Sequence, residues 1–238
     1  MAGRTLLGQP APVTVLRQYK EKKGVAIGDL SFEHLLRRIA KLGPDDIVLS
    51  MIGGSQYAVF STVQHPQPFD FYVTNGSIEP DPEAQIIPFR TLEEFFATTV
   101  LDGASLDDGG KIRGDRQRLE AVKSGTQAQV IHLLPPPPAY DNENIARRHE
   151  NLFADGIRDF GVAPPELRLK FWSLQADILT RFCANHGIEL MPPPGKATSN
   201  GYLRPEYHHG GAHANQAYGE LLLQAVEARL RTDDSKIG

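Results

Sequence analysis

Three short apolar segments, each followed at once by glycine or proline, constrain the fold of this chain most strongly. Segments of this length, rich in valine, isoleucine and leucine, are typical of buried strands, and proline cannot continue a central strand. Sequences with helical periodicity fill the intervals between them. Strands that alternate with helices predict a parallel sheet covered by helices on both faces. The expected strands are residues 47–52, 129–134 and 188–191, which end at Gly53-Gly54, Pro135–Pro138 and Pro192–Pro194.

The other expected elements follow from the same patterns. A short aromatic strand over residues 69–73 ends at the turn Asn75-Gly76. His132 lies inside the second apolar strand, where we expect a role in the core rather than in catalysis. The predicted fold is α/β, with three layers and a mainly parallel central sheet, in a single domain over residues 1–238 with residues 1–28 as an N-terminal extension. The expected helices are residues 31–42, 91–99, 115–123, 142–160, 165–185 and 216–231.

The composition is that of a compact protein. Hydrophobic residues make up 40% of the chain and charged residues 23%, which is enough to build a core and too balanced for disorder. The net charge of −4 gives no reason to expect nucleic-acid binding, and no apolar run has the length of a membrane span. The single cysteine, Cys183, lies in an apolar helical pattern and suits a reducing compartment. We therefore expect a cytoplasmic protein with no nucleic-acid and no membrane partner.

A candidate nucleophile follows the first strand. There, Gly53-Gly54-Ser55-Gln56 places a serine hydroxyl at the carboxyl edge of the sheet, where open α/β sheets bind ligands. The glycines permit a tight turn, and backbone N–H groups in that turn can stabilise an oxyanion. The segment is not a Gly-x-Ser-x-Gly elbow, because Tyr57 stands in place of the second glycine. The alternative is an ordinary strand-to-helix turn with a capping serine.

A candidate general base lies near the C-terminus. The segment His208-His209-Gly210-Gly211-Ala212-His213-Ala214-Asn215 precedes the last expected helix, for which Asn215 is a good N-cap. An imidazole held beside glycines there can point into a crevice, so we interpret His213 as the base. One alternative is that the three histidines are exposed loop residues. Another is a metal patch of His208, His209 and His213, but no carboxylate or cysteine pattern completes a familiar ligand set. We expect no metal and no cofactor.

Together, these two segments resemble the SGNH, or GDSL-type, hydrolases. In that family a Gly-Asp-Ser block follows the first strand and an Asp-x-x-His block precedes the last helix. Here these blocks correspond to Gly53-Gly54-Ser55 and Gly210-Gly211-Ala212-His213. The resemblance implies a flavodoxin-like fold and the hydrolysis or transfer of an acyl group from a small-molecule or acylated substrate. It also implies Ser55 as nucleophile, His213 as base, and Gly54 and Gln56 as oxyanion-binding or site-lining residues.

The chain departs from the pattern of that family at three places. Gly54 stands where the family has an aspartate, and Gly210 stands where it has the acid of the triad. No Gly-x-Asn-Asp block lies between Ser55 and the first proline segment. Glu206 is the nearest acid in sequence that can orient His213, and a backbone carbonyl in the glycine loop is the other candidate. The alternative function is a catalytically inactive relative that keeps the fold as a binding or structural protein. The sequence leaves the substrate and the oligomeric state open.

Overall fold

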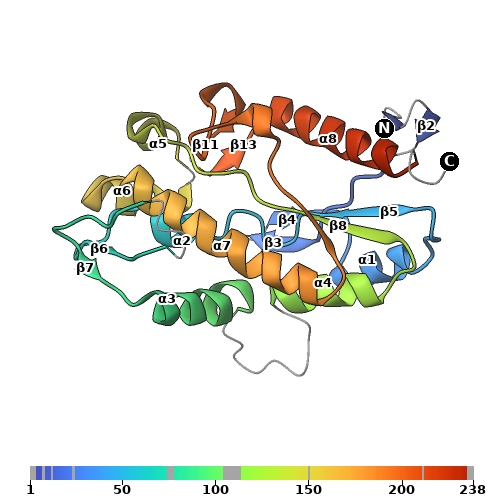
Figure 1. The fold of residues 1–238 in the computed structure, drawn as a ribbon, viewed down its shortest axis with the longest axis horizontal. Helices are drawn as coiled ribbons and strands as arrows, with labels where there is room; N and C mark the ends of the chain where they lie inside the picture. Colours follow the sequence, from blue (N-terminus) through green and yellow to red (C-terminus); the bar gives the residue numbers. More distant parts are fainter. Residues whose placement is uncertain are drawn as a thin grey trace.

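The computed structural model describes residues 4–6, 9–11, 13–22, 25–73, 78–103, 114–149, 151–210 and 212–234. Its centre is a parallel sheet of three strands in the order β5-β8-β9, of which β5 and β8 are labelled in Figure 1. The pairing places Ser50 beside His132 and Leu133 beside Met191, so the three strands end at one edge. The strands β5 (Ile47–Ser50), β8 (Gln129–Leu133) and β9 (Glu189–Met191) fall inside the three apolar segments, which confirms that prediction.

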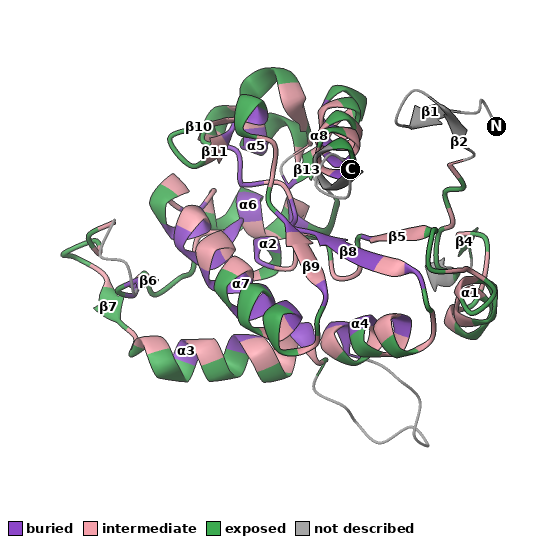
Figure 2. Cartoon of the chain, turned by 45° about the vertical axis from the view of Figure 1, so that its right-hand side comes forward, coloured by how far each residue is buried: buried purple, intermediate pink, exposed green. Residues whose placement is uncertain are grey.

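Helices cover both faces of this sheet. On one face, the last helix packs against Ile131 and Leu133 of β8. On the other face, Val130 and Leu134 pack against three helices, in a cluster where Cys183 is fully buried. This alternation follows from the two-residue period of a strand, and it gives an α/β fold of three layers with β8 buried between helices (Figure 2). The covering helices are α8 (Gln216–Asp234) on the first face, and α1 (Phe32–Ile39), α4 (Asp115–Ser124) and α7 (Pro165–Asn185) on the second.

A second core lies around the N-terminal half of α7. Phe71, Phe96 and Phe171 are buried there, and the rings of Phe71 and Phe171 meet edge to face with centroids 5.3 Å apart. The predicted aromatic strand is shorter than expected and does not join the central sheet. Only β6 (Phe69–Asp70) is strand, and it pairs in parallel with β7 (Gln85–Ile86). The turn Asn75-Gly76 lies outside the described residues.

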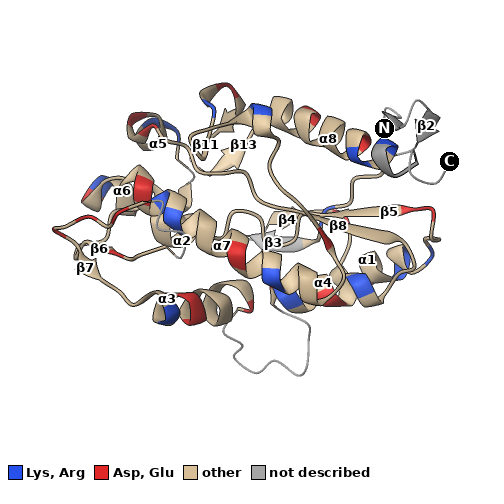
Figure 3. Cartoon of the chain, in the orientation of Figure 1, with Lys and Arg blue, Asp and Glu red and all other residues tan. Residues whose placement is uncertain are grey.

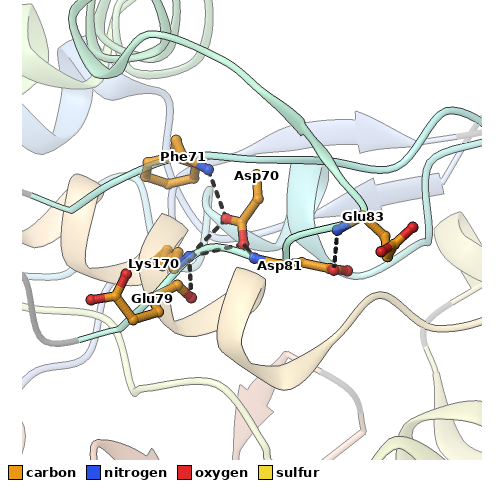
Figure 4. A network of polar contacts seen from close by, with 6 residues as sticks. All are labelled: Asp70, Phe71, Glu79, Asp81, Glu83 and Lys170. Atoms are coloured by element: carbon orange, nitrogen blue, oxygen red, sulfur yellow. Dashed lines mark hydrogen bonds and ion pairs between the residues drawn. The ribbon is translucent and has the colours of Figure 1, made fainter.

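A buried ion pair joins β6 to α7 beside this second core (Figure 4). The Nζ atom of Lys170 lies 2.9 Å from both carboxylate oxygens of Asp70, and both side chains are almost fully buried. The same Nζ donates to the carbonyl of Glu79, while the N–H groups of Phe71 and Asp81 donate to the Asp70 carboxylate. Because both charges are paired and further hydrogen-bonded, the pair can be held in apolar surroundings.

The expected helices are present with adjusted ends. The segment 165–185 is one helix with those bounds, whereas 142–160 divides into two helices joined by a short 3-10 turn. Among the described residues, no helix is both long enough and apolar enough to cross a membrane. The remaining elements are β1 (Arg4–Leu6), β2 (Gln9–Ala11), β3 (Lys20–Lys22), β4 (Val25–Ile27), α2 (Ala58–Ser61), α3 (Phe89–Phe95), the π-helix η1 (Phe96–Leu101), α5 (Asn142–Arg148), η2 (Asn151–Phe153), α6 (Ala154–Phe160), η3 (Gly195–Ala197), β10 (Thr198–Ser199), β11 (Tyr202–Leu203), η4 (Pro205–Tyr207), β12 (His208–His209) and β13 (His213–Ala214).

Candidate functional site

The turn that carries Ser55 begins directly after the carboxyl end of β5. Gly53 and Gly54 both have positive φ, +88° and +53°, a conformation that favours glycine. A Cβ atom at Gly53 would lie 2.9 Å from a carboxylate oxygen of Asp115, so a larger residue there would also have to displace the Asp115 side chain. The turn leads into α2 and leaves Ser55 half-buried at the edge where the strands of the sheet end.

One side chain from α7 holds this turn on both sides of Ser55. The amide of Gln175 donates from Nε2 to the carbonyl of Gly54 at 2.8 Å, and its Oε1 accepts from the N–H of Tyr57 at 2.8 Å. Gln175 is 1% exposed. The role of Gln175 was not predicted from the sequence, although a glutamine next to Leu174 in the apolar pattern of α7 is the kind of buried polar side chain that needs a partner. Gln175 therefore fixes the backbone on either side of the candidate nucleophile.

The proline segment after β8 forms the neighbouring part of the same edge. The hydroxyl of Tyr57 donates to the carbonyl of Pro136, and the indole N–H of Trp172 donates to the carbonyl of Pro135, each at 3.1 Å. Arg168 is buried and donates to the carbonyls of Ala139, Tyr140 and Ala163. Burial lowers the pKa of Arg168 to about 10, still well above neutral pH. Carbonyl groups of the proline segment are therefore fixed by side chains from the Ser55 turn and α7.

The histidine segment is a β-hairpin rather than an open glycine loop. β12 and β13 pair in antiparallel fashion, with His209 opposite His213, and Gly210 has a φ of +72° in the connection. The side chain of His213 is exposed. The predicted N-cap of α8 is confirmed, because the N–H of Tyr218 donates to Oδ1 of Asn215 at 3.2 Å.

The structure brings the Ser55 turn and this hairpin into contact. The hydroxyl of Ser55 lies 2.9 Å from the carbonyl oxygen of Ala212, the residue immediately before His213, across 157 positions of sequence. Because a carbonyl can only accept, the hydroxyl proton points at the hairpin backbone. Transfer of that proton to His213 therefore requires a rotation of the Ser55 side chain or a shift of the hairpin. The contact places the hydroxyl beside the segment that carries the candidate base.

Gln56 points toward a buried carboxylate. Its Nε2 lies 3.3 Å from Oδ2 of Asp115 at the start of α4, and Arg118 lies 3.6 Å from the other carboxylate oxygen. Burial raises the pKa of Asp115, and the charge of Arg118 and the hydrogen bond from Gln56 both oppose that rise. The Gln56 amide thus links the Ser55 turn to the start of α4. A role for Asp115 at this site was not predicted from the sequence.

Two other residues named from the sequence have clear surroundings. Glu206 is exposed in η4, and its backbone carbonyl accepts from Nδ2 of Asn215 at 2.7 Å, which ties its segment to the residue at the start of α8. His132 is 1% exposed, with Nδ1 at 3.4 Å from Oγ of Ser50. Burial lowers the pKa of His132 to about 4, so the ring is neutral at pH 7 and lies in the core as expected.

A pocket of about 590 Å³ lies between β12 of the hairpin and α5. Among the described residues, no cluster of histidine, cysteine, aspartate and glutamate is able to hold a metal ion. The proposed patch of His208, His209 and His213 is therefore not formed as a ligand set. The pocket is lined by Asp141, Asn144, Arg148, Pro205, His208, His209 and Gly210.

Comparisons with known proteins assign no family to this chain. No protein-family model matches the chain, and no curated protein matches it. Among solved structures, the chain is similar to a protein provisionally named as a platelet activating factor from Streptococcus pneumonia. The identity is 12% and the TM-score 0.38, over 84% of this chain and 91% of that one.

Proposed function

We propose that this protein is a serine ester hydrolase or acyl-transfer enzyme of the SGNH type, with Ser55 as nucleophile and His213 as base. The observation that supports this most is the 2.9 Å hydrogen bond from the Ser55 hydroxyl to the carbonyl of Ala212. It joins two segments that the sequence resemblance pairs as nucleophile and base blocks. Their position at the carboxyl edge of a parallel sheet is where ligands bind in open α/β folds.

In the proposed reaction, Ser55 Oγ attacks the carbonyl carbon of an ester while His213 takes the hydroxyl proton. The oxyanion that forms needs donors. The N–H of Gln56 already donates to Gly54 within the turn, whereas the N–H groups of Gly54 and Ser55 have no partner among the described residues. We assign these two N–H groups to the oxyanion. Collapse of the intermediate releases the alcohol, which takes the proton from His213, and leaves an acyl group on Ser55.

The second half of the reaction decides between hydrolysis and transfer. Water or a second alcohol attacks the acyl group on Ser55, His213 takes the proton of the attacking group, and that proton returns to Ser55 as the acyl group leaves. Loss of the acid from a triad lowers turnover by about 10⁴-fold in a known case. Since Gly210 has no side chain, we expect slow turnover, with Glu206 or a hairpin carbonyl orienting His213.

The test is a screen of acyl esters of increasing chain length with the wild type and Ser55→Ala. The proposal predicts hydrolysis of some of these esters by the wild type and none above background by Ser55→Ala. Ser199→Ala, at an exposed serine of β10, is the matched control and should keep full activity. Equal activity of wild type and Ser55→Ala would contradict the proposal. Product analysis with an added alcohol then separates transfer from hydrolysis.

A second candidate is a binding or structural protein that keeps this fold without catalysis. It is favoured by the direction of the Ser55 proton, which points at a backbone carbonyl, and by the glycine in place of the triad acid. If the protein has this second function, the wild type hydrolyses no ester in the screen, and Ser55→Ala does not differ from the wild type in that assay. Both candidates retain the proposed cytoplasmic location.

A further inference from the structure

The pocket beside the histidine hairpin has features of a ligand site that the proposed chemistry at Ser55 does not use. Its volume of about 590 Å³ lies within the range of small-molecule sites, about 300–1,000 Å³. One wall consists of Asp141, Asn144 and Arg148, which share a face of α5 because they are spaced by three and four residues. The opposite wall consists of residues from the start of η4, from β12 and from the connection after it.

Among the side chains that line the pocket, only that of Pro205 is apolar. Sites for aliphatic chains are lined mostly by apolar side chains, so this pocket does not suit the chain of a fatty acyl group. Imidazole and amide groups both donate and accept hydrogen bonds, as hydroxyl groups do. The His209 ring and the Asn144 amide therefore match a ligand that carries several hydroxyls.

The charges of the pocket are separated along α5. Asp141 caps the helix, with Oδ1 accepting from the N–H of Asn144 at 3.0 Å, and Arg148 lies at the last position of the helix, about 10 Å further along at the rise of an α-helix. Figure 3 shows acidic and basic residues together on α5. Arg147 pairs with Glu143 at 2.9 Å, but Arg148 makes no hydrogen bond or ion pair with any residue in the described part of the chain. A guanidinium in that position is free to bind an acidic group of a ligand.

His208 is a fixed part of the wall. Its Nε2 lies 2.8 Å from the carbonyl of Leu203, and because a carbonyl only accepts, Nε2 carries a proton. The start of α5 is also held, by the hydrogen bonds from Arg168 to the carbonyls of Ala139 and Tyr140. Both walls of the pocket are therefore tied to the rest of the fold before a ligand binds, which lowers the ordering cost of binding.

We propose that this pocket binds a sugar that carries an acidic group, either a carboxylate or a phosphate, with the acidic group on Arg148 and hydroxyl groups on Asp141, Asn144 and His209. His209 pairs directly with His213 across the hairpin, so a ligand in the pocket contacts the strand partner of the proposed base. Binding of a ligand to this pocket does not depend on the proposed function of Ser55.

The experiment titrates the full-length protein with D-glucuronate, glucose 6-phosphate and glucose, and measures binding by calorimetry. Glucuronate carries a carboxylate, glucose 6-phosphate carries a phosphate, and glucose carries no acidic group. The proposal predicts that at least one of the two anions binds more tightly than glucose. Arg148→Gln should lower the affinity for that anion about tenfold or more, since a charge-assisted hydrogen bond is lost. Arg147→Gln, on the neighbouring paired arginine, should leave its affinity unchanged.

The outcomes separate this inference from the proposed function. Ser55→Ala should bind the anion as the wild type does, because the hydroxyl of Ser55 is not part of the pocket. Binding with no ester hydrolysis would leave the pocket assignment standing while the proposed function failed. Ester hydrolysis without binding of either anion would overturn the pocket assignment alone. Equal affinity of the wild type and Arg148→Gln, or tighter binding of glucose than of both anions, would also overturn it.

Discussion

Replacement of Gln175 by leucine tests how the Ser55 turn is held in place. The change keeps a side chain of similar size but removes the acceptor for the N–H of Tyr57 and the donor to the carbonyl of Gly54. The two losses differ in cost. Gly54 is exposed, so water can replace the lost donor at its carbonyl, whereas Tyr57 is 1% exposed and its N–H loses its buried acceptor.

The expected cost follows from the buried N–H. A buried polar group left without a partner costs about 1–3 kcal/mol, so we expect the free energy of unfolding of Gln175→Leu to fall by about 2 kcal/mol. For a chain of this length that lowers the Tm by roughly 4–8 °C. Reactivity of Ser55 should fall as well, because the backbone on both sides of it is no longer fixed.

The assay is thermal unfolding followed by circular dichroism, with Gln117→Leu at an exposed position of α4 as control. Gln175→Glu adds a pH signature. A protonated carboxyl can both donate to Gly54 and accept from Tyr57, whereas the ionised form can only accept. Burial raises the folded-state pKa above the unfolded value of about 4.3, so this variant should be most stable at acid pH and lose stability as pH rises through the folded pKa. A Tm of Gln175→Leu equal to that of Gln117→Leu would refute the reasoning.

Three further predictions follow from the described geometry. Lys170→Met leaves the Asp70 carboxylate buried without its cation and should lower the free energy of unfolding, measured by chemical denaturation, by about 3–5 kcal/mol. The double variant Asp70→Asn/Lys170→Met should recover part of this loss. Equal stability of the wild type and Lys170→Met would contradict the buried pair. The ring protons of His132 should show no titration between pH 5 and 8 by NMR. Because its pKa is lowered to about 4 by burial, His132 stabilises the fold above its unfolded pKa of about 6.5, and this contribution is lost as pH falls toward 4. Gly210→Asp restores the acid of the family pattern at a positive-φ position that aspartate tolerates better than most residues, so esterase activity should rise or stay unchanged. Glu206→Gln should lower esterase activity if Glu206 orients His213. Loss of activity in a folded Gly210→Asp protein would contradict the assignment of the hairpin as the SGNH base segment.

The sequence predicted the layers of the fold better than it predicted the contacts of the site. Apolar runs closed by glycine or proline located β5, β8 and β9, and an apolar helical pattern that opens with proline located α7 with its observed bounds. These signals are local, because each is set by residues within one element. The assignment of the whole chain to a single domain stays a prediction.

Contacts between distant segments had no such local signal. The pairing of β6 with β7 depends on a segment held by Lys170 of α7, far along the chain. The role of Gln175 depends on the Ser55 turn packing against the same helix. Glycines near His213 indicated a loop, yet antiparallel pairing with His209 makes that segment a hairpin. In the first two cases the partner is set by packing of elements that the sequence does not place relative to one another, whereas the paired His209 and His213 of the hairpin are only four positions apart.

The most direct test of the central claim is the site of reaction with a fluorophosphonate at neutral pH, located by mass spectrometry of the digested protein. The proposed function predicts an adduct on Ser55 in the wild type and strong suppression of that adduct in His213→Ala, with the circular dichroism spectrum of the variant unchanged. An adduct on another residue, equal labelling of Ser55 in His213→Ala, or no adduct where a known serine esterase reacts fully would contradict the claim.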